Sequence, residues 1–298
     1  MKFAFTIILF ASFTCFAVGN FRPHMTVNAT LNSTVTPSAP VAIEIYFSNP
    51  ENQLIYKDFI PTNGKIMHMV LVKNDLSTFK KVYPYFDPSS GRFRVTLNTP
   101  HSDPDNAHAS FALTDAGKYF VVVEVNVKEL GLMSTHFSLI GEGHHQGTPI
   151  AVDPIDADMS ITKYFGKTEK SERPHYKARL SHATSSICMA ILNEFKLEVF
   201  TLNEQTNEYA PIKGIAPTLG RSAQAVWLSS TLASGHNSHH GIFHGDMADG
   251  IFKFIFKDKA KLLPGIQKIW FQLRHEGRNI IMPFVFDYNP EPITNDNC

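Results

Sequence analysis

PTNGKIMHMVLV, from Pro61 to Val72, is matched without a gap by PTLGRSAQAVWL, from Pro217 to Leu228. Both segments open with Pro-Thr, hold a glycine followed by a basic residue, and run into an apolar stretch in which Val70 aligns with Val226. The glycine and proline predict a turn, and the apolar stretch predicts a buried strand. The chain therefore holds two copies of one turn-and-strand element.

The surroundings of these two segments also repeat. IEIYFSN, from Ile43, stands before the first copy as LEVFTLN, from Leu197, stands before the second. AGKYFVVVEV, from Ala116, corresponds to PGIQKIWFQL, from Pro264, and each is followed by a turn and a further apolar run. Similarity over several elements indicates two copies of a whole structural unit.

The runs within each copy alternate between apolar and polar residues, as in VAIEIYF, RFRVTL, FKLEVF and IFKFIF. Such alternation is typical of half-buried strands, and Gly-, Pro- and Asn-rich turns separate the runs. We therefore predict an all-β fold with two tandem antiparallel β-sandwiches, at residues 36–150 and 174–290. Residues 151–173 are expected to form a linker and 291–298 a polar tail. A single large β-sandwich is the alternative.

The amino terminus has the three parts of a secretory signal peptide. Lys2 is followed by the uncharged run of residues 3–16, and Ala17-Val18-Gly19 supplies small residues for cleavage before Asn20. This run is shorter than the roughly 20 residues of a transmembrane helix. We expect residues 1–19 to be removed, and the mature protein to be secreted, extracellular and without a membrane span.

The segment after the signal peptide, residues 20–35, is rich in Ser, Thr, Asn and Pro. It contains two N-glycosylation sequons, which begin at Asn28 and Asn32. We expect this segment to be exposed and irregular, and at least one of the two asparagines to carry a glycan.

Two of the three cysteines, Cys188 and Cys298, remain after removal of the signal peptide. In an oxidising compartment they are expected to form a disulfide bond with each other. Cys298 is the last residue, so pairing between two chains through Cys298, with Cys188 as a buried thiol, is the alternative.

The charges of the chain are balanced, with 27 Lys and Arg residues against 27 Asp and Glu residues. This balance argues against nucleic acid or an anionic membrane as an obligate partner. The expected partner is an extracellular protein or a glycan.

Histidine gives the most unusual chemistry. Four of the 14 histidines fall in ASGHNSHHGIFHGD, and imidazole is a ligand of copper and zinc. The hypothesised copper or zinc ligands are His236, His239, His240 and His244. The simpler interpretation is a solvated Gly- and Ser-rich loop that binds metals only weakly.

Two other places in the sequence offer potential ion ligands. His68 lies in the alternating run MHMVLV with Val70 and Val72, so a partly buried core histidine is favoured over a metal ligand. The segment SDPDNA, between His101 and His108, offers oxygen ligands but lacks the full ligand spacing of a calcium loop.

The two copies resemble the YtkA-like and cupredoxin-like β-sandwich domains of bacterial secreted proteins. The resemblance rests on KIMHMVLVKNDLSTFKKVYP in the first copy, and on PTLGRSAQAVWLSS with PGIQKIWFQLRHEGRNIIMPFVF in the second. It implies an immunoglobulin- or cupredoxin-like sandwich without enzymatic activity. Some domains of this group occur beside metal-handling proteins. Only His68 matches a histidine of that family, because Lys81-Val82-Tyr83-Pro84 and Gln224 replace its other histidines.

The sequence contains none of the GxSxG, HExxH, P-loop or GxGxxG motifs. The pair His275-Glu276 lies in HEGRN, which predicts a hairpin turn. The favoured hypothesis is a secreted, non-enzymatic binding protein of the matrix, coat, adhesion or signalling kind. The alternatives are a secreted copper- or zinc-binding protein that uses the histidine-rich loop, and a metal-dependent secreted enzyme.

Overall fold

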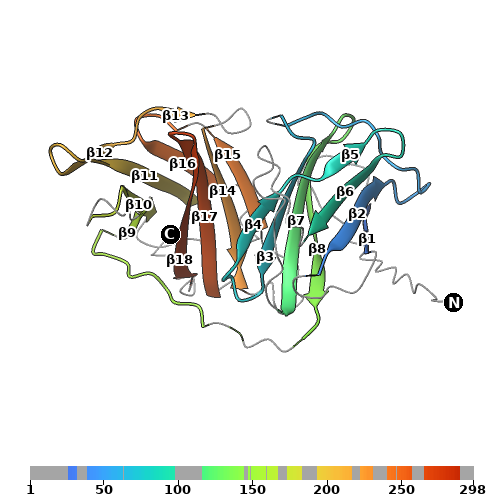
Figure 1. The fold of residues 1–298 in the computed structure, drawn as a ribbon, viewed down its shortest axis with the longest axis horizontal. Coiled ribbons are helices and arrows are strands. Elements are labelled where there is room, and N and C mark those ends of the chain that lie inside the picture. The colour runs from blue at the N-terminus through green and yellow to red at the C-terminus, as the bar shows by residue number, and fades with distance from the viewer. Residues whose placement is uncertain are drawn as a thin grey trace, which may run out of the picture. The chain divides into compact units, whose positions relative to one another are not determined.

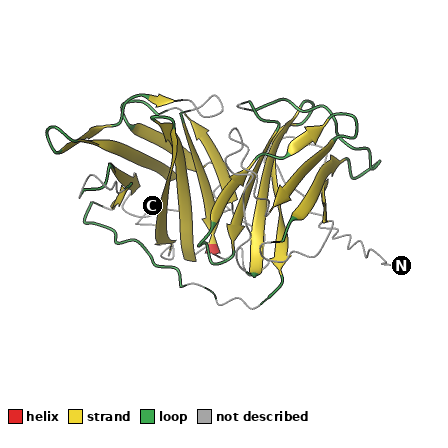
Figure 2. Ribbon diagram, viewed as in Figure 1, coloured by secondary structure: helices red, strands yellow, loops and turns green. Residues whose placement is uncertain are grey.

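The computed structural model describes residues 26–31, 39–62, 64–97, 116–143, 147, 149–158, 160–166, 173–182, 193–216, 222–230, 240–245, 247–256 and 265–288. It divides into two compact units, residues 1–149 and 150–298. Strands dominate both units, as Figure 2 shows. Among the described residues, no helix has the length and apolar character needed to cross a bilayer.

The first unit is an antiparallel sandwich of two four-stranded sheets (Figure 1). The sheets have the orders β1-β2-β6-β5 and β4-β3-β7-β8. These are the orders A-B-E-D and C′-C-F-G of immunoglobulin sandwiches. The strands are β1 Thr26–Leu31, β2 Val41–Ser48, β3 Met67–Lys73, β4 Phe79–Val82, β5 Tyr85–Asp87, β6 Arg92–Leu97, β7 Gly117–Val127 and β8 Gly131–Gly141.

The second unit repeats the central strand pairings of the first and has further strands beside them. One sheet has the order β9-β10-β11, with β12 and β16 both paired to β11, and the other has the order β15-β14-β17, with β13 and β18 also paired to β17. The strands are β9 Ser160–Phe165, β10 Tyr176–His182, β11 Asn193–Asn203, β12 Glu208–Pro211, β13 Ile215–Ala216, β14 Ala223–Ser229, β15 His240–Gly245, β16 Ile251–Phe256, β17 Gly265–His275 and β18 Arg278–Tyr288. The all-β fold of two tandem sandwiches is confirmed.

Strand register shows that the sequence repeat is structural. Val70 of β3 lies opposite Val122 of β7, and Val226 of β14 lies opposite Trp270 of β17. The sequence aligns Val70 with Val226 and Val122 with Trp270. Equivalent residues therefore pair with equivalent residues in the two units.

Alternating side chains fill each sandwich. In β2, Val41, Ile43, Ile45 and Phe47 are at most 1% exposed, while the residues between them are less buried. This is the pattern of a strand with one face against the opposite sheet. Each unit accordingly has a hydrophobic core of its own.

Two boundaries differ from the sequence expectation. Residues 26–31, placed in an irregular segment, form β1 and pair with β2. Residues 160–165, placed in the linker, form β9 and pair with β10. Both strands are only six residues long. Strands this short contain too few apolar residues to be distinguished from a polar loop in the sequence. Their conformation is set by pairing with the neighbouring strands.

Asp153 attaches the start of the second unit to β18. Its carboxylate accepts a hydrogen bond from the Val285 backbone N–H at 2.7 Å and forms an ion pair with Lys163 at 2.8 Å. The Asp153 backbone N–H donates to the Val285 carbonyl oxygen at 2.9 Å. Part of the expected linker is therefore hydrogen-bonded to a sheet.

Replacing Asp153 by alanine is expected to lower the free energy of unfolding by about 1–3 kcal/mol, because a half-buried N–H and a lysine lose their acceptor. Urea unfolding followed by circular dichroism measures the change. Asp158→Ala is the matched control, since its ion pair with Arg179 is made by a carboxylate that is 77% exposed. The control should change stability by less than about 0.5 kcal/mol. Equal effects of the two substitutions would contradict the assigned role.

Candidate functional site

The histidine-rich tract is described only in part. His240 is the first residue of β15, and His244 is the last but one. The backbone pairs His240 with Leu228 of β14, and His244 with Gln224. His236 and His239 lie outside the described residues. The copper or zinc site of these four histidines stays a prediction.

His68 lies in β3 of the first unit and is 1% exposed. Its Nε2 lies 2.9 Å from the Thr62 carbonyl oxygen, as an N–H donor would. Its ring meets the Tyr83 ring edge-on, with centroids 5.6 Å apart. The structure thus places His68 inside the protein, with a backbone carbonyl at hydrogen-bond distance.

The predicted modification sites are mostly outside the described residues. This holds for Asn32, Cys188 and Cys298. The Asn28 backbone lies in β1, opposite Tyr46 of β2, so this sequon is in a strand rather than in irregular chain. The glycans and the disulfide bond stay predictions.

A group of potential metal ligands lies where the two sheets of the second unit meet. His175, His275 and Glu276 each offer one ligand atom, and these atoms all lie within 4.8 Å of one another. His175 immediately precedes β10 in one sheet, whereas His275 ends β17 in the other. We call these three residues the 175–275–276 group.

The backbone of a tight turn places Glu276. His275 pairs with Arg278, so Glu276 and Gly277 form a two-residue hairpin loop between β17 and β18. Both loop residues have positive φ, 50° and 74°, as a type I′ turn requires. The hairpin turn predicted from HEGRN is confirmed, and it places an exposed carboxylate next to the buried His275.

The Tyr176 hydroxyl holds the His275 ring. The hydroxyl oxygen lies 3.1 Å from His275 Nδ1, and the two rings meet edge-on with centroids 5.7 Å apart. Burial raises the pKa of Tyr176, the Glu276 charge raises it further, and the Arg278 charge acts in the opposite direction. Tyr176 is therefore a neutral hydrogen-bonding partner that connects the two sheets.

The backbone around His175 is fixed from both sides. The His175 N–H donates to the Gly166 carbonyl oxygen at 2.9 Å, and the His175 carbonyl oxygen accepts from the Leu202 N–H at 2.8 Å. The Tyr209 hydroxyl donates to the carbonyl oxygen of Pro174 at 2.6 Å. The position of His175 is thus set by neighbouring strands.

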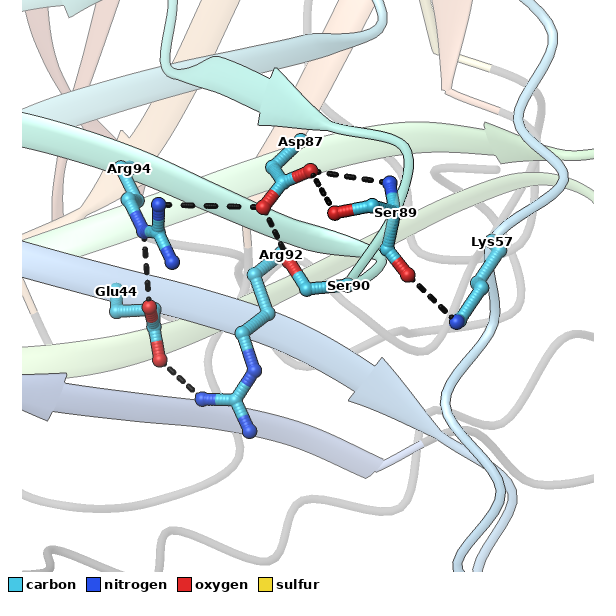
Figure 3. A network of polar contacts seen from close by, with 7 residues as sticks. All are labelled: Glu44, Lys57, Asp87, Ser89, Ser90, Arg92 and Arg94. Atoms are coloured by element: carbon cyan, nitrogen blue, oxygen red, sulfur yellow. Dashed lines mark hydrogen bonds and ion pairs between the residues drawn. The ribbon is translucent and has the colours of Figure 1, made fainter.

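The first unit carries a polar network on the outside of β2, β5 and β6, drawn in Figure 3. The Glu44 carboxylate accepts hydrogen bonds from Arg92 and, at 3.0 Å, from Arg94 Nε. Asp87 accepts from the Ser89 hydroxyl at 2.6 Å and the Ser90 hydroxyl at 2.8 Å. Arg94 lies 3.9 Å from Asp87 and so joins the two carboxylates into one network.

These contacts keep both carboxylates ionised. Burial acts to raise the pKa of Glu44, but the hydrogen bonds from Arg92 and Arg94 outweigh it and leave the pKa below its ordinary value. The hydrogen bonds from Ser89 and Ser90 lower the pKa of Asp87 to about 2. A carboxylate held ionised in this way is a poor general acid or base near neutral pH.

Sequence reasoning missed the 175–275–276 group. His275-Glu276 was interpreted only as a turn, and His175 was not singled out. Ninety-nine residues separate Tyr176 from His275, so no local spacing connects the two parts. The sequence offered only a weak signal: His175 directly precedes the alternating run YKARL, and His275 follows the run IQKIWFQLR.

No protein-family model and no curated protein matches this chain. The resemblance to YtkA-like and cupredoxin-like domains therefore stays a prediction. What the structure does establish is the antiparallel sandwich in each unit.

Several solved structures are similar at low identity. A tetra-tandem repeat from the extending region of a large adhesion protein is 8% identical, with 88% of this chain and 49% of that chain covered and a TM-score of 0.25. The two-domain fibronectin type III segment of chicken tenascin is 9% identical, with 87% and 97% covered and a TM-score of 0.20. A Ca²⁺-stabilised ice-binding adhesin of an Antarctic bacterium is 8% identical, with 90% and 74% covered and a TM-score of 0.21.

This chain spans about half the length of the first of these structures. TM-scores this low do not establish a common fold. The assignment of the sandwiches therefore rests on the strand order of this chain itself.

Proposed function

We propose that this chain is a secreted protein that acts outside the cell by binding another extracellular molecule, without catalysing a reaction. The observation that carries the proposal is the tandem of two sandwiches, which share the pairing of their central strands and each have a core of their own. Packed all-β units of this kind leave the sheet faces, strand edges and loops as the interacting parts. The signal-peptide pattern and the sequons at Asn28 and Asn32 support export.

Expression of the full chain with its own amino terminus in a secretory eukaryotic cell tests export. We expect the protein in the medium, starting at Asn20, with a gel mobility that N-glycosidase treatment increases. The double substitution Asn28→Gln and Asn32→Gln should abolish the response to the glycosidase. Retention inside the cell with Met1 intact would contradict the proposal.

The secreted protein then tests the binding role. Immobilised protein is expected to retain a member of an array of purified matrix proteins and glycans, with saturable binding. It should leave a panel of hydrolase and oxidase substrates unchanged. Turnover of any of these substrates at a rate proportional to protein concentration would overturn the non-enzymatic part of the proposal.

A further inference from the structure

We propose that the 175–275–276 group binds a zinc ion that connects the two sheets of the second unit. Two imidazoles and one carboxylate, supplied by His175, His275 and Glu276, would be its protein ligands. Zinc accepts this His₂Glu set, and with three protein ligands it keeps a fourth position for water or another ligand. Nothing in the proposed binding role requires this site.

The distances allow the site to close. The three ligand atoms lie within 4.8 Å of one another. Tetrahedral zinc with bonds of about 2.0–2.1 Å needs its ligand atoms about 3.4 Å apart. The buried His275 is the fixed member, whereas Glu276 is exposed and His175 half-buried. Closing the remaining distance requires rotation of these two side chains.

Tyr176 orients the fixed ligand. His275 Nδ1 lies 3.1 Å from the Tyr176 hydroxyl, so the proposed site uses the opposite ring nitrogen, Nε2, as its ligand. Metal-binding histidines commonly hold their second ring nitrogen in such a hydrogen bond, which fixes the ring orientation. Tyr176 is in this sense a positioning residue rather than a ligand.

The first unit supplies an independent comparison. The registers of β7 with β3 and of β17 with β14 make Val127 the equivalent of His275. Val127 is 1% exposed and belongs to an ordinary apolar core. By the register of β1 with β2, Val27 stands where the second unit has Tyr176. The second unit thus replaces two apolar residues of the shared plan by an imidazole and the hydroxyl that holds it.

A stability argument alone does not explain this replacement. Burying an imidazole costs free energy that burying a valine does not, and one neutral hydrogen bond returns only part of that cost. Arg278 contributes a positive charge nearby, but its side chain is exposed and therefore screened by solvent. The ligand atoms of His175 and Glu276 lie close to the buried imidazole, and a shared metal ion would account for its presence there.

The test starts from a full chain in which His236, His239, His240 and His244 are replaced by alanine, so that the histidine-rich tract does not contribute. Titration calorimetry with Zn²⁺ should show one equivalent bound. Co²⁺ in place of Zn²⁺ should give the visible absorption of a four-coordinate ion. Failure of this chain to bind one equivalent would overturn the proposal and leave the binding role of the protein untouched.

Single substitutions then assign the ligands. His175→Gln and Glu276→Gln should each weaken zinc binding by about 100-fold or more, and Tyr176→Phe by about 10–100-fold. His136→Gln in the first unit and Glu208→Gln on an exposed strand of the second are matched controls that should leave the affinity unchanged. The circular dichroism spectrum of each variant reports folding. Unchanged affinity in folded His175→Gln and Glu276→Gln proteins would overturn the assignment.

Discussion

Replacing Trp227 by alanine is expected to lower the free energy of unfolding of the second unit by about 3–5 kcal/mol. Trp227 is 1% exposed and meets the rings of Phe195 and Phe286 edge-on, each at 5.3 Å between centroids. Alanine removes these contacts and leaves a cavity between the sheets. It also removes the indole N–H that donates to Gln267 Oε1 at 2.7 Å.

The hydrogen bond matters because Gln267 is itself fully buried. Its amide group donates to the Ser229 hydroxyl and to the Gly265 carbonyl oxygen, each at 3.1 Å. Trp227→Phe keeps an aromatic ring but leaves Gln267 Oε1 without this donor. We expect a smaller loss of about 1–3 kcal/mol, which separates the hydrogen bond from the cavity.

Urea unfolding followed by circular dichroism measures both Trp227 variants. Ile155→Ala is the control in the same unit, because this side chain is 48% exposed. It should change stability by less than about 0.5 kcal/mol. The description of the core would be contradicted if Trp227→Ala unfolded at the same urea concentration as the control.

The second large effect concerns a buried charged pair in the first unit. Lys81 and Glu124 are each 2% exposed. Burial lowers the pKa of Lys81 to about 7, although the Glu124 charge acts to raise it. Replacing buried charged groups by uncharged residues is commonly neutral or stabilising, because the cost of removing the charges from water disappears. We expect Lys81→Met with Glu124→Gln to raise the free energy of unfolding by about 1–4 kcal/mol at pH 6.

The pH dependence of this gain follows from the two states of Lys81. The unfolded chain holds the Lys81 proton up to a pH of about 10.5, whereas the folded protein releases it near pH 7. Between these values the unfolded state binds more protons, so the contribution of Lys81 to stability rises with pH. Below pH 7 both states are protonated, and the folded state bears the full cost of the buried charge.

Unfolding curves from pH 6 to pH 10 test this expectation. The advantage of the double variant should be largest at pH 6 and shrink towards pH 10. The neighbouring residues His68, Tyr83 and Lys65 are the same in both proteins, so the comparison isolates the effect of Lys81 and Glu124. A gain that is the same at every pH, or a loss at pH 6, would contradict the prediction.

The sequence predicted most of the fold because the fold depends on local patterns. The alternation of VAIEIYF identified β2, and the aligned pair Val70 and Val226 anticipated equivalent strands with equivalent partners. Apolar periodicity and turn residues are properties of neighbouring positions, and one sequence displays them. The short strands β1 and β9 were missed because their pairing depends on β2 and β10 rather than on their own composition.

The candidate site was harder to predict than the fold. The turn at Glu276-Gly277 was predicted from HEGRN, whose glycine readily takes the positive φ that a type I′ loop requires at its second position. The proximity of His175 to His275 was not predicted, because it depends on how the two sheets of the second unit pack against each other. The histidine-rich tract drew attention by its density, whereas His175 and His275 stand alone in the sequence.

The attachment of Asp153 to β18 has a mechanical consequence. Tension transmitted along the chain from the first unit enters the second at Ile150 and reaches Asp153 before it reaches β9. Asp153 is held by two hydrogen bonds to Val285 and an ion pair to Lys163. The load is therefore shared at once between both sheets, through β18 and β9. In a protein stretched between its two ends, the contacts of Asp153 would thus be the first to break. As long as they hold, they protect the six residues of β9 from being separated from β10.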